Sequence, residues 1–243
     1  MVSAFALADP DLGRNLTYGL LDALGRAIVT GRYESAPFPT EAELAKQHGV
    51  SRSVTREAVK MLTAKGLLIA RPRQGTVVQP PTNWNLFDPD ILRWTLERQF
   101  SIELLRHFNE LRLAIEPEAA ALAASQGSQE QLARITSGLQ RLRKAENGAD
   151  HELESDIEFH VAILRATNNP FYAQFRDVVA TALRTSIRFT NTINGRFVSF
   201  DDHAAVHDAI IARDVERARA TMHKLIADVL DLIATAEGGA TRS

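Results

Sequence analysis

The chain has 243 residues, of which 45% are hydrophobic and 24% are charged, with a net charge of −2 and no cysteine. This length accommodates two modest domains or one large one, and the lack of cysteine excludes disulfides, thiolate metal sites and cysteine nucleophiles. No apolar run approaches the roughly 18 residues that a membrane span needs, and the N-terminus lacks the basic and then apolar pattern of a signal sequence. We therefore expect a cytoplasmic protein without a membrane partner.

The first elements are predicted to be helices. Apolar residues at helical spacing over 16–30 indicate a helix that ends at Gly31. A second helix should begin at Thr40, because Thr40 and Glu43 have the spacing of a capping box, in which each side chain satisfies the other residue's main-chain N–H. Gly49 is expected to end this helix, since glycine readily takes the positive φ found at helix C-termini.

Ser51 is the predicted N-cap of a third helix with a basic outer face. The inward stripe of this helix consists of Val54, Ala58, Val59 and Leu62. The outward residues near its N-terminus are Arg52, Ser53, Thr55 and Arg56. Arginine can bind guanine through two hydrogen bonds, and a helix N-terminus favours phosphate, so this pattern suits the DNA major groove.

A short hairpin is expected after the third helix. Residues 67–70 and 76–78 can pair, and the basic tip between them holds Arg71, Arg73, Gln74 and Gly75. From Arg52 to Arg73, six cations stand against one acid, a balance of +5 in a chain of net charge −2. These charges could form an ordinary solvated face, but such a local excess is typical of nucleic-acid binding. The order of elements predicts a winged helix-turn-helix over residues 11–80.

The remainder of the chain is predicted to be helical, so the protein should be mainly α. Residues 81–88 are rich in turn formers and are expected to be a linker, and Asp88-Pro89 begins the next helix. Helices joined by short links should form an antiparallel all-helical bundle over residues 89–238. The expected helices are near 89–98, 101–126, 128–147, 150–168, 170–194 and 200–237.

A polar cluster is predicted inside this bundle. Asp156 and His160 are four residues apart on one helix face among apolar neighbours, and His203 lies on the last helix. A divalent metal could satisfy a buried carboxylate and imidazoles together. The same spacing also fits a simple hydrogen bond between Asp156 and His160, with His203 capped or exposed.

The N-terminal stretch closely resembles the GntR family of bacterial transcriptional regulators. The likeness runs through FPTEAELAKQHGVSRSVTREAVKMLTAKGLL and the wing RQGTVV. It implies that Arg52 and Arg56 contact bases, that Ser51, Ser53 and Thr55 contact phosphates or bases, and that Gln74 and Gly75, beside Arg73, enter the minor groove. The family often has arginine where this chain has Ala42, so the operator sequence that is read could differ.

The second part resembles the FCD effector domain of the FadR-like branch of that family, through LRLAIEPEAAALAA, DIEFHVAILRATNNP and DHAAVHDAIIARDVERARATM. This resemblance implies a divalent metal, such as zinc, nickel or manganese, bound by Asp156, His160 and His203. The family's fourth ligand falls on Leu225, which cannot ligate. His223 should face elsewhere, and His207, one turn from His203, is the better substitute.

Arg112 falls where the family places a cation in its ligand cavity, which implies a partner for a carboxylate effector. An ion pair with Glu116, one turn later, is the alternative. Arg184 and Arg188 are weaker effector-binding candidates of the same kind. The segment PPTNWNLFDPDILRWTLE resembles the sugar-acid-responsive group of the family, which implies an aldonic or related hydroxy acid as effector.

Together these features predict a homodimeric, ligand-responsive repressor that binds a palindromic double-stranded operator. One alternative is a metal-dependent hydrolytic enzyme built on Asp156, His160 and His203. Another is an architectural DNA-binding protein without an effector, although this would leave the inward polar residues of the bundle unexplained.

Overall fold

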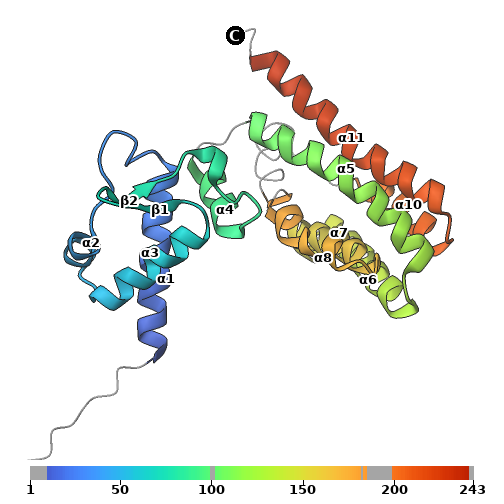
Figure 1. Cartoon of the computed structure of the whole chain (residues 1–243). Coiled ribbons are helices and arrows are strands. Elements are labelled where there is room, and N and C mark those ends of the chain that lie inside the picture. Colours follow the sequence, from blue (N-terminus) through green and yellow to red (C-terminus); the bar gives the residue numbers. More distant parts are fainter. Residues whose placement is uncertain (1–9, 99–101, 182, 185–198, 241–243) are drawn as a thin grey trace, which may run out of the picture. The chain divides into compact units, whose positions relative to one another are not determined.

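The computed structural model describes residues 10–98, 102–181, 183–184 and 199–240 (Figure 1). The chain forms two compact units, Met1–Gln99 and Phe100–Ser243. Among the described helices, none is long and apolar enough to cross a membrane. The mainly α fold and the N-terminal winged helix-turn-helix are as predicted.

The first unit consists of helices around a two-stranded wing. The N-caps of its second and third helices are those that the sequence predicts. Thr40 and Glu43 form the capping box, and Gly49 has the left-handed φ of 65°. Ser51 accepts a hydrogen bond from the main-chain N–H of Val54. In order, the elements are α1 (Pro10–Val29), α2 (Glu41–His48), α3 (Arg52–Ala64), β1 (Leu68–Arg71), β2 (Gly75–Val78), η1 (Pro81–Asn83) and α4 (Pro89–Arg98).

The wing is an antiparallel pair in which Leu68 faces Val78 and Arg71 faces Gly75. Arg73 and Gly75 both have positive φ, 65° and 77°, which closes the tip. Leu68 is buried and anchors the hairpin to the core of the first unit.

Helix α4 packs within the first unit, whereas the predicted domain limits placed residues 89–98 in the second. The Trp94 ring is buried, and its Nε1 donates to Asp22 of α1 over 2.8 Å. At the start of the helix, Lys65 pairs with Asp88 at 2.7 Å and with Asp90 at 2.8 Å. These contacts join α4 to α1 and to the residue that ends α3.

The second unit is all-helical in its described part. Its elements are α5 (Ile102–Gln126), α6 (Gln129–Glu146), α7 (Glu152–Ala166), α8 (Pro170–Gln174), a helical segment at 176–181, α10 (Phe200–Ile211) and α11 (Val215–Ala240). The predicted helix at 170–194 is broken after Gln174, and its last ten residues lie outside the described part.

The expectation of one helix over 200–237 is wrong, because α10 and α11 are separate. The break is at residues 212–214, where Arg213 takes a φ of 60°. Its guanidinium donates to the main-chain oxygens of Ala124 at 3.0 Å and Gly127 at 2.8 Å. Asp214 then accepts from the N–H of Arg217, as a helix N-cap does. The partners of Arg213 are far away in the sequence, so local patterns did not reveal them; the N-cap at Asp214 is the local signal of the break.

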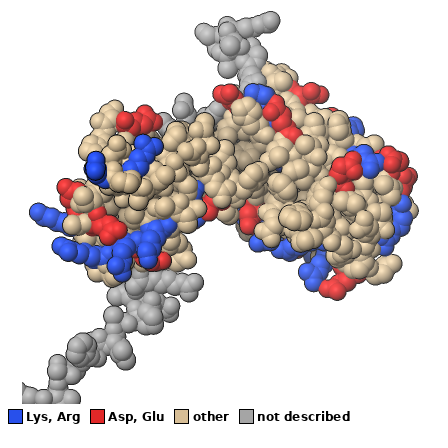
Figure 2. Space-filling view, in the orientation of Figure 1, with Lys and Arg blue, Asp and Glu red and all other residues tan. Residues whose placement is uncertain are grey.

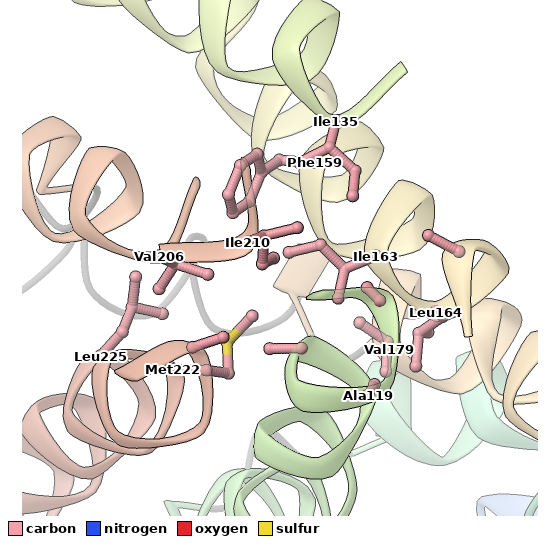
Figure 3. Packing of buried hydrophobic residues seen from close by; sticks show 14 of the residues in the cluster. Ala119, Ile135, Phe159, Ile163, Leu164, Val179, Val206, Ile210, Met222 and Leu225 are labelled. Carbon is pink, nitrogen blue, oxygen red and sulfur yellow. The ribbon is translucent and has the colours of Figure 1, made fainter. Parts of the chain in front are cut away.

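The core of the second unit is formed by buried apolar residues from most of its helices (Figure 3). Phe159 of α7 lies there beside Ile135 of α6, and Met222 of α11 and Ala119 of α5 belong to the same cluster. Small residues let the helices approach closely, since a Cβ added at Gly138 would lie 3.0 Å from the Cα of Phe159. This packing brings one polar face each from α5, α7 and α10 together.

Candidate functional site

The outer face of α3 presents cations to solvent. Arg52, Ser53 and Arg56 are exposed, and Figure 2 shows Lys and Arg side chains gathered over the part of the first unit where Figure 1 places α3. Main-chain N–H groups at the start of this helix add partial positive charge. The combination is suited to phosphates at the helix start and to base edges along the arginines.

Two hydroxyl residues at the start of this helix differ in their exposure to solvent. Ser51 is exposed, and its Oγ lies 2.9 Å from the Oγ of Ser53. Thr55 was expected on the outer face, but the structure buries it completely, and its hydroxyl donates to the main-chain oxygen of Ser51. Thr55 is buried because it shares the inward helix face with Ala58 and Leu62.

At the wing tip, Arg73, Gln74 and Gly75 are all exposed. A narrow tip of this kind, with a cation and an amide, could enter a minor groove. The structure thus leaves every predicted DNA-contacting residue except Thr55 on the surface of the first unit.

In the second unit, the structure brings together the three residues predicted as metal ligands. Asp156 and His160 come from α7 and His203 from α10, and all three are buried. One possible ligand atom from each lies within 4.8 Å of the other two. The two imidazole rings stand edge to face at 5.4 Å. In the part of the chain that the structure describes, this is the group with the residue types and spacing of a metal site.

His160 is held from both sides. Its Nδ1 is hydrogen-bonded to Oε2 of Glu116 on α5, and its Nε2 lies 3.5 Å from Oδ1 of Asp156. Because a carboxylate can only accept, we assign the proton of this bond to Nδ1. Burial lowers the pKa of His160, but the facing charges of Glu116 and Asp156 outweigh burial and raise it to about 9.

His203 is oriented in the same way. Its Nδ1 lies 2.7 Å from the main-chain oxygen of Ser199, which can only accept, and its Nε2 lies 2.9 Å from Oδ1 of Asp156. In each imidazole, therefore, Nδ1 carries a proton and Nε2 faces Asp156. Burial raises the pKa of Asp156, but hydrogen bonds from the two histidines lower it further than burial raises it.

The residues present fit a divalent metal. Two Nε2 atoms and a carboxylate oxygen converge in a buried space, and each histidine has its other nitrogen bound to an acceptor, as metal-ligating histidines do. Without a cation, each Nε2 needs a proton of its own to hydrogen-bond Asp156. A metal would replace those protons.

Arg112 is buried beside this group and forms the ion pair that the sequence offered as an alternative. Its Nε donates to Oε1 of Glu116 at 2.6 Å, and one terminal nitrogen donates to Asn109 at 3.2 Å. The other terminal nitrogen lies 3.5 Å from Nε2 of His160. Burial raises the pKa of Glu116, but the charges of Arg112 and His160 lower it to about 2.

The other predicted residues lie apart from this group. His207 contacts Thr136 and Asp208 through its two ring nitrogens, both at 2.9 Å, so it does not join the three ligands. Leu225 lies in the apolar core with Val206 (Figure 3). Arg184 is exposed and lies 3.5 Å from Glu154, and Arg188 lies outside the described residues.

Sequence reasoning missed the role of Glu116 and Asn109. It considered Glu116 only as a partner of Arg112, although the residue also binds His160. The available signal was their spacing, because Asn109, Arg112 and Glu116 recur every three or four residues and therefore share one face of α5.

Two family models match the chain. The model described as bacterial regulatory proteins, gntR family, matches residues 17–78, and the FCD domain model matches residues 107–228. The first covers the helix-turn-helix and wing, and the second contains Arg112, Asp156, His160 and His203.

Similar proteins cover most of the chain. An uncharacterised HTH-type transcriptional regulator of Escherichia coli, YieP, is 36% identical over 84% of this chain and 90% of its own length. The galactonate operon transcriptional repressor of Escherichia coli is 32% identical over 88% of this chain and 94% of its own. The transcriptional repressor NanR of Cronobacter sakazakii is 28% identical over 76% of this chain and 72% of its own.

Solved structures agree on the fold. A chain from a study of Lar in Listeria monocytogenes has a TM-score of 0.59 at 19% identity, covering 90% of this chain and 96% of that one. McbR/YncC of Escherichia coli has a TM-score of 0.52 at 20% identity, covering 98% of this chain and 100% of that one. The matched families and relatives are regulators, which sets aside the hydrolytic enzyme considered as an alternative. The chain therefore belongs to the GntR family of bacterial regulatory proteins, and it is a transcriptional regulator that joins a DNA-binding helix-turn-helix to an FCD effector-binding domain.

Proposed function

We propose that this regulator is a homodimeric repressor that leaves its operator when a sugar acid, such as an aldonate, binds in the second unit. The observation that carries the proposal is the buried group of Asp156, His160 and His203 with Arg112 beside it. The similarity to the galactonate operon repressor, at 32% identity, supports the same class of effector.

On the DNA side, Arg52 and Arg56 contact bases in the major groove, while Ser51 and Ser53 contact phosphates. Gln74 and Gly75, with Arg73, contact the minor groove. A homodimer presents two such surfaces, so its operator is a palindrome with half-sites roughly 34 Å or a multiple of it apart. The exposed cations of α3 and of the wing tip support this assignment.

On the effector side, Asp156, His160 and His203 hold a divalent metal such as zinc, nickel or manganese. The bound metal supplies a positive centre for carboxylate and hydroxyl oxygens. Arg112 adds fixed positive charge beside it, although Glu116 occupies the Nε side of its guanidinium. A sugar acid carries both kinds of oxygen, which is why we favour this effector class. Arg184 takes no part in this proposal, because it is exposed.

Anisotropy titrations with the promoter fragment next to the regulator's own gene test the DNA half. We expect binding that weakens steeply with salt and exceeds binding to random duplex. Arg52→Ala and Arg56→Ala should each reduce this preference by about 1–3 kcal/mol. Lys60→Ala, which removes one charge from the same helix, is the matched control and should leave the preference unchanged. Equal affinity of the wild-type protein for promoter and random DNA would refute the DNA half.

Thermal melting of the full chain with a panel of aldonates, D-galactonate included, tests the effector half. We expect one or more of them to raise Tm in protein supplied with zinc and to lose this effect when a chelator is added. The same compound should release the promoter fragment. If no aldonate changes either Tm or promoter binding, the proposed effector class is wrong.

A further inference from the structure

Glu116 lies between two cationic side chains of the second unit. It is on α5, one turn after Arg112, and 1% of its surface is exposed. Its two carboxylate oxygens have separate partners, because Oε1 accepts from Nε of Arg112 at 2.6 Å and Oε2 is hydrogen-bonded to Nδ1 of His160. A single side chain therefore fixes both the guanidinium and the imidazole.

The contact with Glu116 decides which nitrogen His160 offers to Asp156 and His203. With Nδ1 bound to the carboxylate, Nε2 is the atom that lies 3.5 Å from Asp156 Oδ1. Turning the ring over would point Nδ1 at Asp156 and break the bond to Glu116. His203 is fixed differently, by the main-chain oxygen of Ser199, so its orientation does not depend on an acidic side chain.

We propose that Glu116 is the positioning residue of the Asp156, His160 and His203 group, and that through His160 it sets the affinity of this group for a divalent metal. The inference rests on the metal-binding part of the proposed function. It assigns to Glu116 a role in which the residue never touches the metal. Carboxylates that accept from the distal N–H of a ligating histidine hold the ring and make it a better donor, and their loss typically weakens metal binding about 10–100-fold.

Glutamine at this position is an informative replacement, because its shape matches that of glutamate while its amide has one acceptor atom instead of two. The single amide oxygen can accept from Arg112 or from His160, but it cannot replace the two separate carboxylate oxygens. If this oxygen stays on Arg112, the NH2 group faces Nδ1 of His160 and favours the tautomer with the proton on Nε2. That proton would lie where the metal binds.

The test compares zinc affinity of the full chain for wild type, Glu116→Gln and Glu118→Gln, by competition with a chromogenic chelator. Glu118 is the matched control, because it lies two residues along α5 and pairs with Arg219 at the surface. We expect Glu116→Gln to bind zinc about 10–100-fold more weakly and Glu118→Gln to match wild type. Wild-type zinc affinity in a folded Glu116→Gln protein would overturn the proposal.

A second measurement does not depend on whether the variant folds. Nitrogen-15 NMR of histidine-labelled, zinc-loaded wild type should show zinc on Nε2 of His160 and a protected proton on Nδ1. Zinc bound through Nδ1 of His160, or a wild-type chain that takes up no zinc, would overturn the inference. The role of Glu116 and the proposed function can fail separately. If zinc affinity depends on Glu116 but no aldonate releases the promoter, the role of Glu116 stands and the proposed function is wrong.

Discussion

At the scale of single residues, Asp22 shows how one carboxylate can join distant parts of the first unit. It accepts from Arg26 on its own helix at 2.8 Å, and from Trp94 at 2.8 Å and Arg93 at 2.9 Å on α4. Burial raises its pKa, but these hydrogen bonds, that from Trp94 first, outweigh burial and lower the pKa from 3.8 to about 2.

This lowered pKa predicts a pH dependence of stability. A carboxylate whose folded pKa lies below its unfolded pKa stabilises the fold above the unfolded value, and the contribution is lost as pH falls through the folded value. The contribution of Asp22 should therefore be present at neutral pH and disappear between about pH 5 and about pH 2. Because the side chain is 37% exposed, solvent screening makes the effect modest.

Thermal melting across this range, for wild type and Asp22→Asn, measures the contribution. We expect the two proteins to differ most near neutral pH and to converge toward acid pH. Glu43→Gln is a useful comparison, since Glu43 also has a lowered pKa but caps α2 without reaching α4. A difference between wild type and Asp22→Asn that stays constant down to about pH 2 would contradict the assignment.

Residues of the second unit show how far sequence reasoning reaches at this scale. The pairing of Asp156 with His160 could be predicted, because a spacing of four on an apolar face places both groups inward. For His203, the residues alone left open whether it meets the pair or is capped or exposed, since periodicity gives the inward face of each helix but not which faces meet. The family resemblance favoured the meeting that the structure shows. Thr55 was misplaced because its hydroxyl suggested a contact, whereas its helical position already placed it inward.

At the scale of elements, helix caps were predicted well because capping is local. Thr40, Glu43 and Gly49 lie within ten residues and determine both ends of α2 together. The turn between α10 and α11 was missed because Arg213 is held there by the end of α5 and the residue that follows it, almost ninety residues earlier. Its positive φ is unusual for a residue with a side chain.

Substitutions at Arg213 should separate the stabilisation from its hydrogen bonds from the strain of its positive φ. Arg213→Ala loses both hydrogen bonds to the main-chain oxygens of Ala124 and Gly127 and keeps the unfavourable φ, so we expect a loss of about 1.5–3 kcal/mol in unfolding free energy. Arg213→Gly loses the same bonds but tolerates the φ, and should be more stable than the alanine variant by roughly 1 kcal/mol. Urea unfolding of both variants measures the difference, and equal stabilities would mean that the turn is not strained.

Packing of α4 on α1 offers another prediction at the element scale. A Cβ added at Gly25 would lie 2.3 Å from ring atoms of Trp94, so Gly25→Ala must displace that ring, and with it α4. At Gly19, on the same helix, an added Cβ meets nothing within 4 Å. Intrinsic helix propensity alone favours alanine by up to about 1 kcal/mol at either position.

We therefore expect Gly19→Ala to raise the stability of the first unit and Gly25→Ala to lower it. Fluorescence of Trp94, in a Trp84→Phe background, should move to longer wavelength in Gly25→Ala as the ring meets water. An unchanged spectrum and a stability gain equal to that of Gly19→Ala would show that Trp94 does not pack against Gly25 as described.

At the scale of the whole molecule, the two units have different functions, DNA binding in the first and effector binding in the second. In the proposed function the cations of α3 and the wing supply DNA affinity, but they do not determine when DNA is bound. In the proposed function the buried group of α5, α7 and α10 responds to a ligand. Its contacts between helices join residues 44 to 48 positions apart and so depend on the folded bundle. Regulation requires that the ligand have different affinities for the DNA-bound and DNA-free forms.

This difference in ligand affinity predicts that operator and effector weaken each other's binding equally. If an aldonate lowers operator affinity by some factor, saturating operator must lower aldonate affinity by the same factor, which is typically about 5–150-fold for coupled sites. Calorimetric titration of the zinc-loaded chain with the aldonate, alone and with excess operator duplex, measures one side of the cycle, and anisotropy measures the other. A scrambled duplex is the control and should leave aldonate affinity unchanged. Operator release without a matching loss of aldonate affinity would mean that the compound acts on DNA binding by another route, such as removing the metal, and that the second unit is not the switch.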